Sequence, residues 1–149
     1  MTERILVLNG PNLGRLGTRE PDIYGTATHA DLVAACDRAG DDAGVSVEVR
    51  QTDDEATYLN WLHAAADDGF AALVLNPAAW THTSVAVRDA AAMLPVPYVE
   101  VHLSNPLARE EFRHVSYTAG HAAGIVAGYG IDSYALAIRA LASRLQAQS

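Results

Sequence analysis

The chain contains 149 residues with a mass of 15.8 kDa; 50% of the residues are hydrophobic and 19% are charged. This balance is typical of one folded domain with its own core, and it excludes an intrinsically disordered chain. The formal net charge is −8, and no basic stripe is present. A general nucleic-acid binder must neutralise phosphates and is therefore excluded. We predict a single domain over residues 1–149 with no nucleic-acid partner.

Two residue types narrow the possible chemistry. The ten basic residues are all arginines, so the sequence contains no lysine. This excludes Schiff-base formation, pyridoxal-phosphate attachment and a P-loop lysine. The single cysteine, Cys36, excludes a disulfide framework and a cysteine-based metal site, and we predict that it is a buried small hydrophobe. Apolar runs such as 71–75 are too short to cross a bilayer, and residues 1–4 do not resemble a signal peptide. We expect no membrane association and a cytoplasmic location.

Short β-branched segments alternate with longer alanine-rich segments along the chain. In chain order, the pattern predicts a strand at 4–9, a helix at 30–44, a strand at 46–52, a helix at 54–68, a strand at 71–76, a helix at 84–94, strands at 98–102 and 124–127, and a final helix at 130–146. Thr28 and Asp31 are predicted to cap the first helix, and Gly69 to end the second. This alternation predicts right-handed βαβ units and a parallel sheet covered on both faces. The predicted fold is an α/β, flavodoxin-like three-layer sandwich with a five-stranded parallel sheet in the order 2-1-3-4-5.

Two connections are much longer than this plan requires. Residues 10–29 and 103–123 each span about twenty positions, where such loops usually have about 2 to 6 residues. The second is expected to contain one helical turn around 108–112. Long connections of this kind usually carry function. Under the predicted strand order, the strand ends at Asn9, Asn76 and His102 are neighbours, so their polar side chains should share one cleft.

Glu100 and His102 are two positions apart in a predicted strand, so their side chains project from the same face. A carboxylate beside an imidazole can select its tautomer and make it a proton donor near neutral pH. A purely structural Glu–His pair is the alternative. His82 could approach His102, but no third ligand accompanies them, so the sequence favours no metal site.

The first long connection does not match a phosphate-binding loop. Gly10, Gly14 and Gly17 lack the GxGxxG spacing, and Pro11 removes one amide that a phosphate cradle would use. A flavodoxin-like ligand- or nucleotide-binding module without catalysis is the alternative class of function. It would need a Ser/Thr-rich loop leading into the first helix and aromatic residues that stack on a flavin, and the chain has neither.

Several short motifs, read together, resemble one enzyme family, the type II 3-dehydroquinases (3-dehydroquinate dehydratases). They are Leu8-Asn9-Gly10-Pro11-Asn12-Leu13, Arg19-Glu20-Pro21 with Tyr24-Gly25, Asn76-Pro77, Thr81-His82-Thr83-Ser84, Arg88-Asp89-Ala90, Glu100-Val101-His102-Leu103-Ser104-Asn105, Arg109-Glu110-Glu111-Phe112-Arg113 and Ser116-Tyr117. The resemblance covers essentially the whole chain. It implies a lyase that dehydrates 3-dehydroquinate to 3-dehydroshikimate in the shikimate pathway of aromatic amino acid biosynthesis, without metal or cofactor. It also implies a homododecamer built from trimers.

The resemblance also implies roles for individual residues. Tyr24 would be the base that removes a C2 proton, and Arg19 would favour its phenolate. Asn12 would hold a water against the enolate oxygen, and His102, oriented by Glu100, would protonate the departing C1 hydroxyl. The substrate would be gripped by Asn76, His82, Arg113 and the backbone amides of Leu103 and Ser104, with Asp89 acting near the site of an adjacent subunit.

The proposed base requires a large electrostatic contribution. A tyrosine with an ordinary pKa of about 10 needs about 4 kcal/mol to be a phenolate near pH 7. One arginine about 4 Å away supplies up to about 4 kcal/mol at an effective dielectric of about 20. Arg19 could therefore account for most of the shift in Tyr24. By the same resemblance, Ala78 stands where many relatives have glycine. Independently of the resemblance, the sequence shows no partner for His29, His114 or His121, and these side chains are expected to be solvated.

Overall fold

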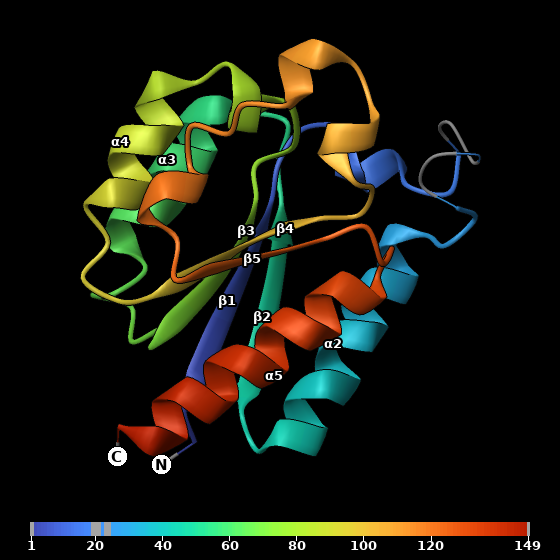
Figure 1. The fold of residues 1–149 in the computed structure, drawn as a ribbon. Coiled ribbons are helices and arrows are strands. Elements are labelled where there is room, and N and C mark those ends of the chain that lie inside the picture. The colour runs from blue at the N-terminus through green and yellow to red at the C-terminus, as the bar shows by residue number, and fades with distance from the viewer. Residues whose placement is uncertain (1, 19–21, 23–24, 149) are drawn as a thin grey trace.

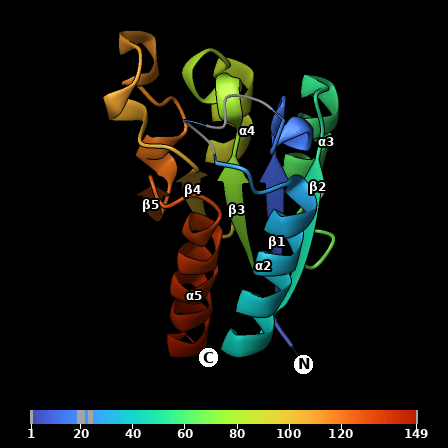
Figure 2. The same cartoon turned by 90° about the vertical axis from the view of Figure 1, so that its right-hand side faces the viewer.

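The computed structural model describes residues 2–18, 22 and 25–148 of the chain. It contains one five-stranded parallel sheet in the order β2-β1-β3-β4-β5. The strands are β1 (Arg4–Asn9), β2 (Ser46–Gln51), β3 (Ala72–Asn76), β4 (Tyr98–His102) and β5 (Gly124–Ala127), and the longer helices are α2 (His29–Ala43), α3 (Glu55–Ala64), α4 (Val85–Ala92) and α5 (Asp132–Ala147). Helices α2 and α5 cover one face of the sheet, and α3 and α4 cover the other (Figures 1 and 2). The predicted α/β sandwich and strand order are confirmed.

Alternating side chains of the central strands build two separate cores. Ile5 and Val7 of β1 pack with the α2 and α5 side of the molecule, whereas Leu6 and Leu8 pack with the α3 and α4 side. All four are 0% exposed. The two-residue period of a strand therefore explains why β1 is apolar throughout, since both of its faces are covered.

Local capping sets the helix starts. Thr28 accepts from the backbone N–H of Asp31 and donates its own backbone N–H to the Asp31 carboxylate, which is the predicted capping box. Asp54 and Ser84 cap α3 and α4 more simply: each side chain accepts one hydrogen bond from a backbone N–H of the first helical turn.

The predicted helix 54–68 is wrong at its C-terminal end, because α3 stops at Ala64. Turns follow, and Gly69 adopts a φ of +93°, after which Phe70 donates its backbone N–H to the carbonyl of Ala65. Asp67 and Asp68 would place two carboxylates at the negative end of the helix dipole, which disfavours continuing the helix through them. The interpretation that Gly69 ends this segment stays correct.

The two long connections lie at the carboxyl end of the sheet (Figure 1). The first contains the 3₁₀ helix Leu13–Arg15. The second contains three 3₁₀ helices, Pro106–Ala108, Glu111–Arg113 and Ala119–His121, instead of the single turn expected around 108–112. Asn9 pairs with Asn76 across β1 and β3, and Leu75 pairs with Glu100 across β3 and β4, so the strand ends are level. Within the described ranges, no helix is both long and apolar enough to span a membrane.

Candidate active site

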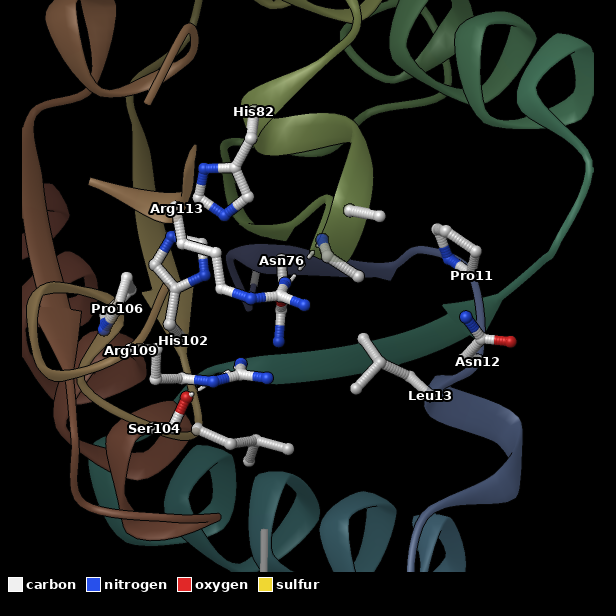
Figure 3. A pocket seen from close by; sticks show the side chains of 13 residues that line it. Pro11, Asn12, Leu13, Asn76, His82, His102, Ser104, Pro106, Arg109 and Arg113 are labelled. Atoms are coloured by element: carbon white, nitrogen blue, oxygen red, sulfur yellow. Dashed lines mark hydrogen bonds between the residues drawn. The ribbon is translucent and has the colours of Figure 1, made fainter. Parts of the chain in front are cut away.

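A cavity opens at the carboxyl ends of β1, β3 and β4, between the two long connections (Figure 3). Seven of the predicted site residues line this cavity: Asn12, Asn76, His82, His102, Leu103, Ser104 and Arg113. The predicted convergence is confirmed for Asn76 and His102, whereas Asn9 is 0% exposed and does not line the cavity; the residues that follow β1 line it instead. The cavity sits where strand order reverses between β1 and β3, as expected for an open parallel sheet.

Glu100 and His102 form the buried pair of the site. Nε2 of His102 donates to Oε2 of Glu100 over 2.9 Å, and the two residues are 8% and 1% exposed. The hydroxyl of Ser116 donates to the same carboxylate at 2.9 Å, and the hydroxyl of Thr118 donates to its other oxygen. Burial raises the pKa of Glu100, but the hydrogen bonds from His102, Thr118 and Ser116 outweigh burial and leave it below its ordinary value. Glu100 is therefore a carboxylate at neutral pH and keeps the Nε2 proton on His102.

His82 lies beside His102 with a different tautomer. Its Nδ1 donates to the backbone carbonyl of Val115 over 2.8 Å, which leaves Nε2 as the ring acceptor. The two imidazole rings are nearly parallel, with centroids 6.3 Å apart. The pKa of His82 is lowered, mainly by burial and also by the positive charges of His102 and Arg113. The hydrogen bond to the Val115 carbonyl and the charge of Glu100 act in the opposite direction but do not outweigh them. A neutral His82 can accept a hydrogen bond from a hydroxyl in the cavity.

Two guanidinium groups make the cavity positive. Arg113 and Arg109 both line it, from the second long connection (Figure 3). Nε of Arg113 lies 3.1 Å from a carboxylate oxygen of Glu110, and Nη1 of Arg109 donates to the hydroxyl of Ser104 over 3.3 Å. Arg109 is a site residue to which the sequence assigned no role. Its place in the same connection as Arg113 was the available signal, because that connection follows the strand end at His102.

Asn12 is held at the opposite wall by the end of β2. Its backbone adopts a φ of +70°, and its N–H donates to Oδ1 of Asp53 over 2.8 Å. Gln51 donates to the carbonyl of Gly10 over 3.1 Å and also to Asp53. The side chain of Asn12 lines the cavity. Asp53 and Gln51 are supporting residues that the sequence did not single out, since their contact to the first connection depends on the β1–β2 pairing.

The remaining predicted residues lie elsewhere. Asp89 pairs with Arg88 at 2.8 Å on an exposed face of α4 and does not line the cavity. Arg19 and Tyr24 lie outside the described residues. His29 was predicted to have no partner, and this is wrong: its Nε2 lies 3.2 Å from Nδ2 of Asn9.

His114 was also wrongly predicted to have no partner. Its Nε2 bonds the carbonyl of Arg109 over 3.1 Å. The partner of His29 is 20 positions away, whereas that of His114 is only 5 positions away in the same irregular connection, where hydrophobic periodicity gives no signal.

The described residues contain no group of three histidine, cysteine or acidic side chains that could hold a metal ion. The cavity instead combines a carboxylate-bound imidazole, a neutral imidazole, two guanidinium groups and two primary amides. Such a set can bind an anionic, hydroxylated small molecule and exchange protons with it. Residues 3–142 match the sequence model of the Dehydroquinase class II family. The chain belongs to this family.

Relatives of this class II dehydroquinase align over nearly their whole length. It is 60% identical over 141 residues to the 3-dehydroquinate dehydratase of Salinispora tropica, covering 95% of this chain and 98% of the relative. It is 51% identical over 146 residues to the 3-dehydroquinate dehydratase of Mycobacterium tuberculosis, covering 97% and 99%. The crystal structure of the type II dehydroquinase from Propionibacterium acnes matches with a TM-score of 0.91 and 54% identity, over 96% of this chain and 98% of that one. The fold and the family are therefore shared along the full domain.

Proposed function

We propose that this class II dehydroquinase dehydrates 3-dehydroquinate to 3-dehydroshikimate in the shikimate pathway, as the names of its relatives indicate for those proteins. The observation that carries the proposal is the buried Glu100–His102 pair facing a cavity with a positive wall. A held imidazole supplies a proton donor, and the guanidinium group of Arg113 supplies attraction for a carboxylate substrate. No cofactor is needed for the loss of water from a β-hydroxy ketone through an enolate.

The elimination divides into two proton transfers on opposite faces of the ring. Tyr24 is the proposed base that removes a C2 proton, with Arg19 assigned to favour its phenolate, and the electron pair moves onto the C3 carbonyl oxygen as an enolate. Asn12 holds a water against that oxygen. The enolate then reforms the carbonyl while the C1–O bond breaks. His102, with Nε2 held by Glu100, gives a proton from Nδ1 to the departing hydroxyl, which leaves as water. The placement of His102 and Asn12 on facing walls of one cavity supports a proton donor at C1 and a water-holding amide at the C3 oxygen of the same substrate (Figure 3).

Substrate binding is assigned to the polar lining of the same cavity. Asn76 presents its amide from the end of β3, and His82 presents a ring acceptor. Arg113 and the backbone amides of Leu103 and Ser104 lie on the wall that follows β4. The carboxylate and ring hydroxyls of a quinate-like molecule match this arrangement of donors and acceptors.

The assembly and the location are also proposals. We infer a homododecamer built from trimers, in which Asp89 lies near the site of a neighbouring subunit, and a cytoplasmic location. Leu107, Phe112 and Ile125 are 67%, 62% and 55% exposed, and burial in a subunit interface would remove these apolar surfaces from water. Size-exclusion chromatography with light scattering at micromolar concentration tests the assembly, and a monomer would contradict it.

The function is tested by following the ultraviolet absorbance of the conjugated product from 3-dehydroquinate, with a chelator present. We expect unimpeded turnover; loss of turnover on chelation would contradict the mechanism. Tyr24→Phe and Arg19→Ala are each expected to lower kcat by about 10² or more, because each removes part of the base. Circular dichroism should show a retained fold in both. Near-normal turnover in either variant would overturn the assignment, and binding without any product would favour a non-catalytic binding module.

A further inference from the structure

Four polar side chains form a continuous hydrogen-bonded chain beneath the cavity, and the proposed mechanism uses only the first of them. Nδ2 of Asn76 donates to the hydroxyl of Tyr134 over 2.8 Å, and that hydroxyl donates to Oδ1 of Asn9 over 2.7 Å. Nδ2 of Asn9 then lies 3.2 Å from Nε2 of His29. Tyr134 and Asn9 are 0% exposed and Asn76 is 3% exposed. Only His29, at the start of α2, is partly open to solvent.

The direction of this chain is set by one backbone group. The N–H of Ala78 lies 3.1 Å from Oδ1 of Asn76, and a backbone N–H can only donate. The other end of the Asn76 amide is therefore its NH₂ group, so Tyr134 accepts from it and must give its own proton to an oxygen of Asn9. Asn9 then turns its NH₂ group to His29, whose Nε2 must be a lone pair.

Other features agree with this direction. Burial lowers the pKa of His29, so a neutral ring with an accepting Nε2 is favoured near neutral pH. Burial also raises the pKa of Tyr134 far above its ordinary value, despite the opposing hydrogen bond from Asn76. The phenol therefore keeps its proton and stays a donor to Asn9 over the whole working range of pH.

The consequence for the cavity is a defined polarity at Asn76. Its oxygen is occupied by Ala78, and one of its two amide hydrogens is occupied by Tyr134. The second amide hydrogen is the group left for a ligand, and Asn76 lies in the centre of the cavity lining (Figure 3). If the amide turned over, an oxygen would face an anionic ligand and the Ala78 N–H would lose its acceptor, which is costly for a buried donor.

We propose that Tyr134 is a positioning residue that holds the Asn76 amide with its N–H toward the cavity, so that the site selects a ligand oxygen able to accept a hydrogen bond. This inference rests on the proposed function, because it assigns Asn76 to the carboxylate of the substrate or to a ring hydroxyl that takes no part in the reaction. These oxygens carry the same charge throughout the elimination. Tyr134 therefore supports binding of the ground state and the transition state equally.

The first test compares Tyr134→Phe with a matched control, Tyr58→Phe. Tyr58 is also 0% exposed, and its hydroxyl donates to the carbonyl of Leu8 over 3.0 Å, away from the chain. We expect Tyr134→Phe to raise KM about tenfold with kcat changed by less than about twofold, since uniform binding is lost. Tyr58→Phe should change KM by less than about twofold. An equal rise in KM in both variants would mean a general cost of removing a buried hydroxyl, and it would overturn the proposal.

The second test asks whether Tyr134 acts through Asn76. Asn76→Ala should raise KM, and adding Tyr134→Phe to that variant should raise it no further, because the positioned group is already absent. Independent effects that multiply in the double variant would overturn the proposal. Asn9→Ala is a further variant that keeps the Tyr134 ring: it frees the phenol to donate to Asn76 and should give the same rise in KM.

A crystal structure of Tyr134→Phe separates this proposal from the proposed function. The Asn76 oxygen is expected to stay on the Ala78 N–H, while Nδ2, which has lost its acceptor, rotates about that contact away from its wild-type direction. An Nδ2 that keeps its wild-type position in the variant would overturn the positioning role, whatever the enzyme catalyses. If the wild-type protein does not turn over 3-dehydroquinate, the proposed function is refuted. The position of the Asn76 amide in the variant crystal structure then still tests the role of Tyr134.

Discussion

Replacing Thr118 by valine removes one of the hydroxyls that hold the Glu100 carboxylate. Thr118 is 0% exposed, and its hydroxyl donates to Oε1 of Glu100. The variant keeps the shape of the side chain and exchanges the hydroxyl for a methyl group. Ser116 and His102 remain as donors to the same carboxylate. The substitution therefore weakens the stabilisation of the Glu100 carboxylate without removing Glu100 or His102.

The expected loss of stability follows from the charge of the acceptor. A hydrogen bond to a charged group contributes about 1.5–3 kcal/mol, so the free energy of unfolding should fall by about 2 kcal/mol. For a chain of this size, that corresponds to a fall in Tm of about 4–8 °C. Wild type and variant must be compared at one protein concentration, because association adds to apparent stability.

The sign of the pH dependence follows from the pKa of Glu100. Burial raises this pKa, but the hydrogen bonds from His102, Thr118 and Ser116 bring it below its ordinary value. A depressed pKa contributes stability above the unfolded pKa, and this stability is lost as the pH falls through the folded pKa. Thr118→Val raises the folded pKa, so the difference from wild type should be largest at neutral pH and shrink in acid. The acid limb of the activity profile should also move to higher pH, since a protonated Glu100 no longer orients His102.

Thr81→Val is the matched control for this prediction. Thr81 is also 0% exposed, and its hydroxyl has no hydrogen-bond partner within the described part of the chain. Its replacement should leave Tm unchanged or slightly raised, because an unpaired buried hydroxyl is removed. Thermal unfolding of both variants between pH 4 and pH 8 gives the comparison. Equal Tm values for the two variants, within about 1 °C, would refute the idea that Thr118 stabilises a buried charge.

Three further outcomes are expected. Gly10→Ala would place a Cβ 2.6 Å from the backbone oxygen of Pro77, so we expect about 1–3 kcal/mol of destabilisation; an unchanged urea midpoint would contradict this close approach. His102→Gln should lower kcat by about 10²–10⁴ in the ultraviolet assay, because the proton donor is lost, and a wild-type kcat would remove His102 from the mechanism. Burial, reinforced by the charge of Asp37, raises the pKa of Cys36 to about 12, so the native thiol should resist alkylation at pH 8 and react only after unfolding; rapid labelling of the folded protein would contradict its burial.

Much of the architecture could be predicted because its causes are local. The apolar run of β1 and the spacing of strands and helices predicted the sheet order, and Thr28 with Asp31 predicted the first helix start. The predicted C-terminal end of α3 was wrong, because the hydrophobic pattern does not take into account the unfavourable carboxylates of Asp67 and Asp68 at the end of a helix. The second long connection folds as three 3₁₀ helices, which are short and carry little periodic signal.

The site residues that lie at the ends of strands could be predicted from the sequence. Asn76 and His102 follow buried strands, and parallel strands bring their carboxyl ends to one edge. Arg109 was missed because it reaches the site through the path of an irregular segment, and Asp53 because its contact to the first long connection depends on the pairing of β1 with β2. Ala78 adopts a φ of +53°, in the region that favours glycine, which agrees with the glycine that the resemblance implied there.

By itself, the sequence determined the fold class, the strand order and the family, because these depend on periodic burial and on short motifs that survive in a linear string. Only the tertiary structure decided how the polar groups are paired. Tyr134 is 58 positions from Asn76 and 125 from Asn9, and Thr118 is 18 positions from Glu100. Hydrogen bonds depend on distances and directions between atoms, and segments so far apart acquire these only when the sheet and its helices have packed.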